Sequence, residues 1–301
     1  MARFLKTLMI FALVAGLLLI LVLATGGRYP NLNFKRGSMG HMHTRMQELK
    51  QVHQPDLLVL GSSHAYRSFD VRIFENAGLS CFNLGSSNQT HIQTEVLLHR
   101  YLQTIQPKKI LYEVNPEMFM IDGVESSLDL ISNDTIDALT LEMALNINHL
   151  KTYNTLIHAW FHHLIYPNEI YTEDPVKGDD SYIPGGYVTR KITHFQPVKQ
   201  EEQIIIIQNK QLQAFESNIN LIKKSGIPYL LVYAPTTKLK YQSYRGMNEF
   251  EDKIRTYGPY INCNETLNLD DSLHFWDAEH LNQNGVDIFN NSLLVGILSQ
   301  P

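Results

Sequence analysis

Two short segments, far apart in the sequence, carry side chains that could act together as a nucleophile and its base. Gly61-Ser62-Ser63-His64 follows an apolar run, and Asp277-Ala278-Glu279-His280 lies near the C-terminus. A serine hydroxyl is a good nucleophile only when a base takes its proton, and histidine suits that role because it titrates near neutral pH. A carboxylate on the other ring nitrogen fixes the tautomer. The pattern predicts acyl transfer, with Ser63 as nucleophile, His280 as base and Asp277 orienting His280.

Acyl transfer also needs hydrogen-bond donors for the oxyanion that forms on the substrate carbonyl. Gly85-Ser86-Ser87-Asn88 and Asn115-Pro116 each follow an apolar segment. We therefore expect three donors, namely the N–H of Ser63, the N–H of Gly85 and the side-chain amide of Asn115. Asn88, three residues beyond Gly85, is the alternative to Asn115.

The apolar segments before these residues have the length and composition of buried strands. They are 56–60 (DLLVL), 80–84 (SCFNL), 109–114 (KILYEV) and 227–235 (IPYLLVYAP), and helical patterns at 92–106, 201–224 and 282–300 separate or follow them. Such alternation predicts an α/β fold, a three-layer sandwich with a mostly parallel central sheet covered by helices on both faces. Parallel sheets bind ligands beyond the carboxyl ends of their strands, so the loops after these strands should meet at one edge.

The rest of the soluble part divides into a stalk, a catalytic domain and an insertion. Residues 26–54 are polar and interrupted by glycines, which predicts a stalk with a short helix near 44–52. Residues 55–301 form the catalytic domain. Within it, residues 126–165 have a helical pattern and 166–200 are rich in Pro, Gly and Tyr, so we expect a cap insertion at about 125–200 that controls access to the site.

The N-terminal residues 1–25 place the protein at a membrane. Residues 7–25 carry no charge and follow Arg3 and Lys6. A helix of that length spans about 28 Å, close to the thickness of a bilayer core. We favour an uncleaved single-span anchor with the catalytic domain outside the cytoplasm, and a cleaved signal peptide ending near Ala24 is the alternative.

Composition and spacing exclude several other classes of protein. The chain has 25 Lys and Arg against 30 Asp and Glu, so no excess of positive charge points to nucleic acid. Two cysteines do not make a disulfide scaffold or a cysteine-rich metal site. His158 and His162 have the spacing of zinc ligands on one helix, but the run HAWFHH lacks the glutamate of a zinc protease motif. We expect no metal and no cofactor.

Four ordered segments resemble the sequence blocks of the SGNH (GDSL-like) hydrolases. VLGSSHAYRS puts Ser63 where that family has its nucleophile, and NLG puts Gly85 at its second block. EVNPE aligns Asn115 with the third block although its neighbours differ, and Asp277-x-x-His280 matches the last block. The resemblance covers residues 56–120 and 227–300 and implies the flavodoxin-like fold and the Ser-His-Asp triad of that family.

The departures from the family pattern resemble one of its branches. Ser62 stands where the family usually has Asp, which is closer to membrane-anchored members such as the DltD-like and alginate-acetylation-like proteins. The resemblance implies an esterase or O-acyltransferase that acts on an acyl ester of a cell-envelope glycan or polymer. Two alternatives stay open, namely a non-catalytic assembly or binding protein on the same scaffold, and an accessory partner of a polytopic membrane acyltransferase.

Overall fold

The centre of the molecule is a five-stranded sheet in which every neighbouring pair is parallel. The computed structural model describes residues 1–25, 32–37 and 40–298, and its central strands lie in the order β10-β8-β3-β1-β2. Their bounds are Leu57–Leu60 for β1, Cys81–Asn83 for β2, Lys109–Glu113 for β3, Tyr229–Tyr233 for β8 and Tyr260–Asn262 for β10. The α/β prediction is confirmed. The edge strand β10 was not predicted, because three residues in a polar context give no strand pattern.

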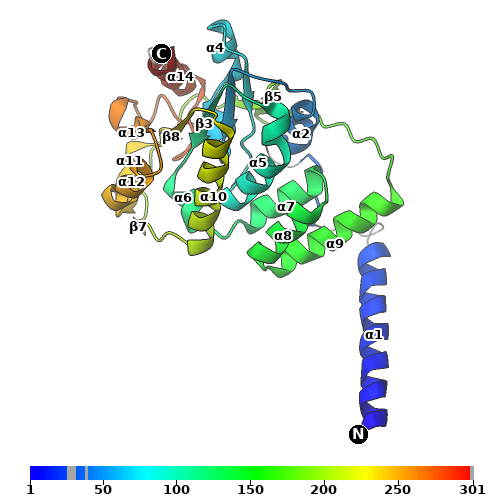
Figure 1. Cartoon of the computed structure of the whole chain (residues 1–301). Helices are drawn as coiled ribbons and strands as arrows, with labels where there is room; N and C mark the ends of the chain where they lie inside the picture. The colour runs from blue at the N-terminus through cyan, green and yellow to red at the C-terminus, as the bar shows by residue number, and fades with distance from the viewer. Residues whose placement is uncertain (26–31, 38–39, 299–301) are drawn as a thin grey trace.

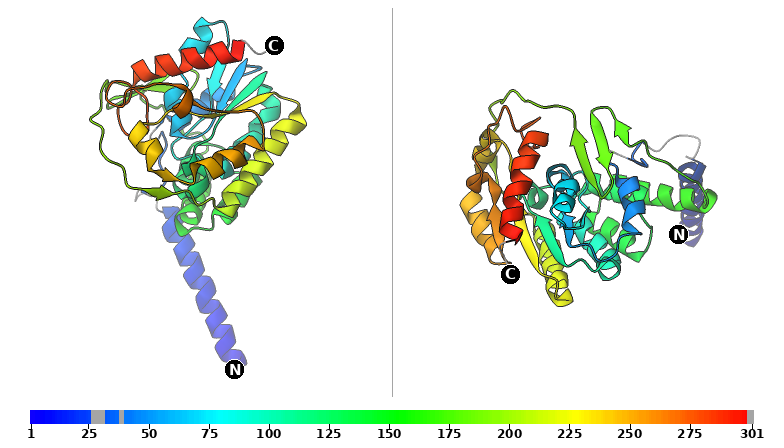
Figure 2. Two further views of the ribbon diagram at one scale, coloured as in Figure 1. Left: turned by 90° about the vertical axis from the view of Figure 1, so that its left-hand side faces the viewer. Right: turned by 90° about the horizontal axis from the view of Figure 1, so that it is seen from above.

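Helices cover both faces of this sheet and make three layers (Figure 1 and Figure 2). Alternate strand residues enter two separate cores, as in β1, where Leu58 and Leu60 face one core and Leu57 and Val59 the other. The first core is formed with α5 (His91–Ile105) and α10 (Asn209–Ser225), and the second with α4 (Val71–Asn76) and α14 (Gln283–Leu298). All four β1 residues are buried, which explains why the strand is apolar throughout.

Shorter elements connect these layers. The remaining helices of the sheet domain are α3 (Ser63–Ser68), α6 (Pro116–Met120), α11 (Lys238–Ser243), α12 (Met247–Arg255) and α13 (Cys263–Thr266). A two-stranded parallel sheet pairs β7 (Gln203–Ile204) with β9 (Tyr244–Arg245). Both cysteines are buried and free.

The segment expected to be a stalk is partly built into the domain. The predicted helix forms as α2 (Met42–Leu49), but Met42, Met46 and Leu49 are buried in the first core. The side chain of Arg45 is also fully buried and donates to the carbonyl oxygens of Gly40 and Gly186. Residues 42–49 are therefore not a stalk, because this helix has an apolar face that the main core covers. Residues 26–31 and 38–39 of the expected stalk lie outside the described residues.

The predicted cap region contains three helices and a small antiparallel sheet. The helices are α7 (Val124–Asn133), α8 (Ala138–Ile147) and α9 (Leu150–Ile165), and the strands are β4 (Val176–Lys177), β5 (Asp180–Ile183) and β6 (Tyr187–Arg190). The helices extend the first core through residues such as Leu130, Met143 and Ala159. The turn at Gly185-Gly186 reaches the end of β2, where Asn83 N–H donates to the Gly185 carbonyl.

The N-terminal helix α1 (Ala2–Thr25) projects away from the domain (Figure 1). The window Ala2–Leu21 is apolar and has none of its surface buried within the molecule. Its length and composition suit a membrane span or a signal sequence.

Candidate active site

The predicted nucleophile lies on a sharp turn between β1 and α3. Gly61 has a φ of +143°, a backbone conformation that glycine adopts without strain. Ser62 caps α3 by accepting a hydrogen bond from the N–H of His64. Ser63 is the first helical residue, so the turn presents it at the carboxyl edge of the sheet.

The structure brings the three predicted triad residues together. Ser63 Oγ lies 2.8 Å from His280 Nε2. His280 Nδ1 lies 3.0 Å and 2.9 Å from the two carboxylate oxygens of Asp277. These contacts give the chain of hydrogen bonds that a nucleophile, a base and an orienting acid require.

A small closed loop presents His280 and Asp277. An isolated antiparallel bridge joins Phe275 to Leu281, and both of these side chains are buried in the second core. Asn282 then caps α14, because its side-chain oxygen accepts the N–H of Gly285. The loop is thus fixed at both ends by apolar burial and a helix cap. This explains how His280 can reach Ser63 with one ring nitrogen while Asp277 contacts the other.

Hydrogen bonds keep the Asp277 carboxyl ionised. Partial burial opposes ionisation, but the His280 ring and the backbone N–H groups of Glu279 and His280 outweigh it, so the pKa of Asp277 lies below its usual value. Asp277 is therefore a carboxylate at neutral pH. It can hold the His280 tautomer that leaves Nε2 free to accept the Ser63 proton.

Of the three expected oxyanion donors, one is unengaged. In the described part of the chain the N–H of Ser63 has no hydrogen-bond partner. The N–H of Gly85 donates to Asn83 Oδ1 at 3.1 Å. Both N–H groups of the Asn115 amide are used, at 3.1 Å to Ser62 Oγ and 2.9 Å to Glu113 Oε1. Gly85 and Asn115 border the nucleophile turn, but they must release these bonds before they can bind an oxyanion.

Close packing gives a separate reason for glycine at position 85. A Cβ placed there would lie 2.6 Å from the Cβ of Ala65 and 2.9 Å from the carbonyl oxygen of Ser62. Asn88, the alternative donor, has its amide 2.7 Å from Glu125 Oε2 and is not brought into the triad.

The structure adds a buried carboxyl group, Glu113, that the sequence analysis did not single out. It ends β3, is fully buried, and accepts hydrogen bonds from the N–H and the hydroxyl of Ser62 and from Asn115. Burial raises the pKa of Glu113 above its usual value. The sequence signal for Glu113 was an acidic residue near the end of the mainly apolar strand KILYEV. Glutamate is rarely buried without a partner, so its presence there indicated nearby hydrogen-bond donors.

Trp276 and two arginines pack behind the base. The Trp276 indole is stacked on the His280 ring, with 5.0 Å between centroids and 9° between planes. The guanidinium of Arg190, from β6, lies 4.2 Å from the indole centroid, and that of Arg67, from α3, lies 5.1 Å away. The predicted cap region thus supplies a side chain to the neighbourhood of the triad.

A buried lysine ties the catalytic loop to the neighbouring helices. Lys240 Nζ lies 2.6 Å from Glu117 Oε1 and 2.7 Å from Glu279 Oε1, and its side chain is 5% exposed. Burial opposes its charge, but the two glutamates outweigh that effect and raise the pKa of Lys240 above its usual value. Lys240 is therefore positively charged at neutral pH. Its ammonium group pairs with Glu279, which lies between Asp277 and His280 in the sequence.

His64 lies beside the site without contacting the nucleophile's hydroxyl. Its ring is buried and its centroid is 5.1 Å from that of His280. His280, not His64, occupies the position of the base. Asp70, the other carboxylate close in sequence to Ser63, caps α4 by accepting the N–H of Arg72.

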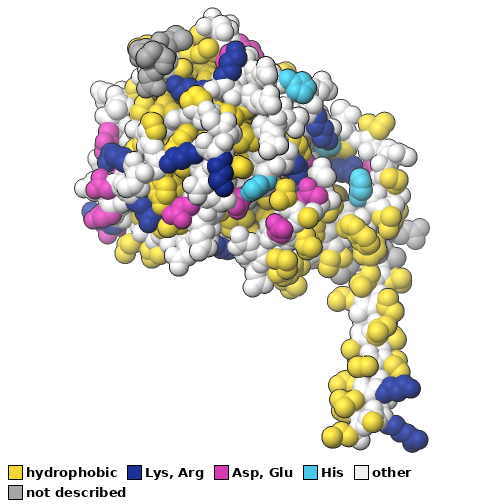
Figure 3. Space-filling model, in the orientation of Figure 1, with side chains coloured by type: hydrophobic (Ala, Val, Ile, Leu, Met, Phe, Trp, Pro, Cys, Tyr) yellow, Lys and Arg dark blue, Asp and Glu magenta, His cyan; other side chains and the backbone are white. Residues whose placement is uncertain are grey.

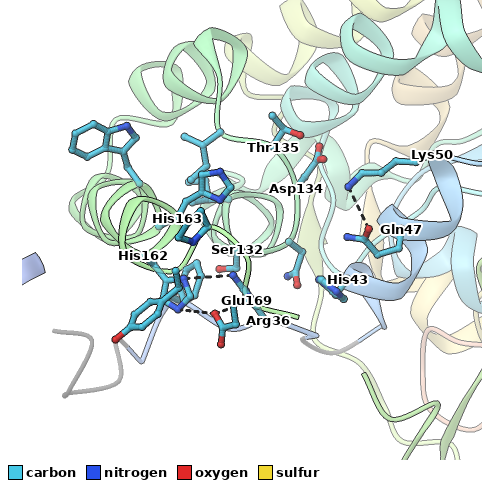
Figure 4. Close-up of a pocket in the computed structure, with 18 residues that line it drawn as sticks. Arg36, His43, Gln47, Lys50, Ser132, Asp134, Thr135, His162, His163 and Glu169 are labelled. Atoms are coloured by element: carbon cyan, nitrogen blue, oxygen red, sulfur yellow. Dashed lines mark hydrogen bonds and ion pairs between the residues drawn. The ribbon is translucent and has the colours of Figure 1, made fainter. Parts of the chain in front are cut away.

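Two histidines of α9, His162 and His163, line a different pocket, of about 390 Å³ (Figure 4). His162 contacts Arg36 at 3.4 Å and Glu169 at 3.3 Å, and Arg36 also pairs with Glu169 at 3.0 Å. Among the described residues no group of three or more His, Cys, Asp or Glu side chains is placed to hold a metal ion.

Comparison with known proteins finds likeness only among solved structures. No protein-family model and no curated protein sequence matches the chain. The chain is similar to a GDSL-like lipase from Bacteroides thetaiotaomicron, with a TM-score of 0.46, 11% identity, and coverage of 88% of this chain and 100% of that one. It is also similar to a candidate acylhydrolase from Bacteroides fragilis, with a TM-score of 0.45, 11% identity, and coverage of 86% and 97%.

Neither structure is described as a DltD-like or alginate-acetylation-like protein. A hydroxyl, an imidazole and a carboxylate in hydrogen-bonded series can activate the hydroxyl for attack on a carbonyl carbon.

Proposed function

We propose that this protein is a membrane-anchored serine esterase or O-acyltransferase of SGNH type that acts on an acyl ester of a cell-envelope glycan or polymer. The observation that carries the proposal is the continuous hydrogen-bond series from Ser63 through His280 to Asp277. It lies where the loops of a parallel sheet gather, which is where such sheets bind ligands.

The proposed reaction has two halves. Ser63 Oγ attacks the ester carbonyl carbon while its proton passes to His280 Nε2, and the Ser63 N–H stabilises the oxyanion. His280 then gives the proton to the departing alcohol, which leaves an acyl-serine. Water or a second hydroxyl, deprotonated by His280, attacks the acyl-serine, and Ser63 recovers its proton. Water as acceptor makes the protein an esterase, and a sugar hydroxyl makes it an acyltransferase.

Covalent labelling with a fluorophosphonate tests the nucleophile. We expect wild-type protein to be labelled and Ser63→Ala to lose labelling completely, because the variant has no side-chain oxygen at this position to attack phosphorus. Ser62→Ala is the matched control, since it removes the neighbouring hydroxyl and leaves that of Ser63. Mass spectrometry of the labelled peptide identifies the modified residue, and equal labelling of wild type and Ser63→Ala would show that Ser63 is not the nucleophile.

A second candidate function is non-catalytic binding on the same scaffold. It is favoured by the engaged oxyanion donors, because the Gly85 N–H and the Asn115 amide both donate within the protein. An assay of an acetylated sugar with and without an acceptor polymer separates the candidates. Free acetate indicates an esterase, and acetylated polymer indicates an acyltransferase. The absence of both products together with an unlabelled Ser63 in the wild-type protein favours binding.

A further inference from the structure

Helices α8 and α9 expose large apolar side chains on the surface beside α1. Leu145 is 58% exposed, Trp160 54% and Leu164 64%. Figure 3 shows hydrophobic side chains gathered over the side of the body from which α1 leaves. We call this surface the apolar face and define it by the exposed side chains Leu141, Leu145, Ile157, Trp160, Leu164 and Tyr166.

The spacing of these residues puts them along continuous stripes. On α9, residues 157, 160 and 164 follow the i, i+3, i+7 pattern of one helix side, and on α8 residues 141 and 145 are one turn apart. The opposite sides of both helices are already buried, for example at Met143, Ile147 and Ala159. The core of the domain is therefore packed by the buried sides of these helices, and the exposed apolar stripes are not part of that packing.

The apolar face continues directly onto the N-terminal helix. Ile20 of α1 lines a groove of about 510 Å³ together with Leu141 of α8 and Ile157 and Trp160 of α9. Among the described residues that line the groove, Asp137 alone is charged, and its carboxylate is held by Arg100 at 2.6 Å and 3.0 Å. A largely uncharged apolar surface thus runs from the end of the span onto the domain.

The chemistry of the apolar face fits one occupant. Its aliphatic side chains suit acyl chains, and Trp160 and Tyr166 are residues typical of the boundary between headgroups and acyl chains. Ile20 lies near the end of the apolar window Ala2–Leu21, which is the level at which a spanning helix leaves the membrane. A lipid surface at that level would meet the α8–α9 pair.

We propose that the apolar face of α8 and α9 rests in the outer boundary of the same bilayer that α1 spans. This inference depends on the proposal that α1 is an uncleaved anchor. The catalytic domain is then attached at two places, the span and the apolar face, instead of swinging on a single tether. Two attachments fix the orientation of the domain and hold Ser63 at a constant height above the lipid.

The two tryptophans of the chain make the test direct. Trp160 belongs to the apolar face, and Trp276 is stacked on His280. Full-length protein is reconstituted in phosphatidylcholine vesicles with or without lipids brominated near the headgroup end of their acyl chains. Trp276→Phe reports Trp160 alone, and Trp160→Phe reports Trp276 alone. We expect Trp160 to be quenched at least about twofold more than Trp276, because interfacial helices bury their apolar side only about 5–10 Å into the bilayer.

Paired substitutions distinguish quenching that depends on the apolar face from quenching that arises only because α1 lies near Trp160. In the Trp276→Phe protein, Leu141→Gln with Leu164→Gln should lower the quenching of Trp160 to the level of Trp276. The matched control replaces two other exposed isoleucines, 66% and 68% exposed, by Ile204→Gln and Ile206→Gln, and should leave quenching unchanged. Intact mass confirms in each sample that α1 is still present.

Three outcomes would overturn the proposal. The first is quenching of Trp160 no stronger than that of Trp276. The second is full quenching in the Leu141→Gln, Leu164→Gln protein, which would mean that α1 alone brings Trp160 near lipid. The third is an unquenched Trp160 in a protein whose copies can be cross-linked to one another through a substituted residue at position 164. That result would show that a second copy covers the apolar face. Fluorophosphonate labelling of Ser63 is read separately, so a failure here is distinct from a failure of the proposed catalysis.

Discussion

Glu113 accepts hydrogen bonds from both donors of Ser62, the residue before the proposed nucleophile. Its Oε2 accepts the Ser62 N–H at 3.2 Å and the Ser62 hydroxyl at 3.0 Å, and its Oε1 accepts Asn115 at 2.9 Å. A buried carboxyl group with this many donors is costly to replace, because each donor left without an acceptor loses its solvation as well. Glu113 therefore positions the Ser62 turn, and its own side chain is fully buried.

The conservative substitution Glu113→Gln tests this role. Its amide NH2 would face either Ser62 or Asn115, both of which donate to Glu113, so one donor loses its acceptor. We expect a loss of about 1–3 kcal/mol in the free energy of unfolding and a lower kcat for ester hydrolysis with a smaller change in KM. Urea denaturation and steady-state kinetics measure these quantities. Wild-type values of both would contradict the role assigned to Glu113.

At the scale of elements, the contact between α5 and β3 contains a buried histidine surrounded mainly by aromatic rings. His91 starts α5, is fully buried, and packs its ring between those of Phe119 and Phe215, at centroid distances of 4.1 Å and 4.9 Å. Its Nδ1 lies 2.7 Å from the hydroxyl of Tyr112. Burial lowers the pKa of His91 from 6.5 to about 3, so the ring stays neutral in the folded protein.

This burial predicts how stability changes with pH. Between about pH 6.5 and 3 the unfolded chain binds a proton on His91 that the folded chain does not, so stability is complete above pH 6.5 and falls as the pH falls. His91 alone contributes a slope of about 1.4 kcal/mol per pH unit in that window. His91→Phe keeps an aromatic ring there and should reduce the slope of the unfolding free energy by that amount.

The measurement is urea denaturation of both proteins at several pH values between about 4 and 7, which cover most of the window in which His91 titrates. His91→Phe also removes a partner of Tyr112, which shifts stability by a constant amount at every pH. The difference in slope, and not the offset, is the readout. Parallel curves for the two proteins would show that His91 is not the group that titrates.

At the scale of the whole molecule, the exposed apolar helix α1 bears on where the protein is located. None of the residues in the window Ala2–Leu21 is buried within the molecule, and its length and composition suit a membrane span or a signal sequence. In the proposal that α1 is an anchor, Arg3 and Lys6 before the span place the N-terminus on the cytoplasmic side and the rest of the chain outside.

Fractionation of expressing cells tests the anchor. We expect the protein to stay in the membrane pellet after alkaline carbonate washing, because a spanning helix is not released when peripheral proteins are stripped. Intact mass should show the N-terminal segment still attached. A soluble product whose sequence starts just after Ala24 would identify a cleaved signal peptide, and it would remove the basis for two-point attachment.

The sequence by itself determined the type of fold, and it indicated Ser63, Asp277 and His280 as the candidate site residues. Short apolar runs separated by helical patterns predict a buried parallel sheet, because such a sheet pairs the backbone groups of the runs and buries their side chains. The resemblance to the ordered blocks of the SGNH hydrolases then placed Ser63, Asp277 and His280 at the edge of that sheet. The sequence also determined the apolar length of α1, because a run of uncharged residues needs no partner to be recognised.

Only the tertiary structure decided how these residues are supported. Glu113 contacts Ser62, which is 51 residues away in sequence, and Trp276 contacts Arg67 and Arg190 from distant elements. No local sequence pattern predicts these contacts. The burial of α2, expected in a stalk, depends on the first core having room for Met42 and Met46. The engaged state of the Gly85 N–H and the Asn115 amide depends on Asn83 and Glu113 lying within hydrogen-bond range. Sequence spacing fixes which groups are available, whereas long-range packing fixes which of them are free to act.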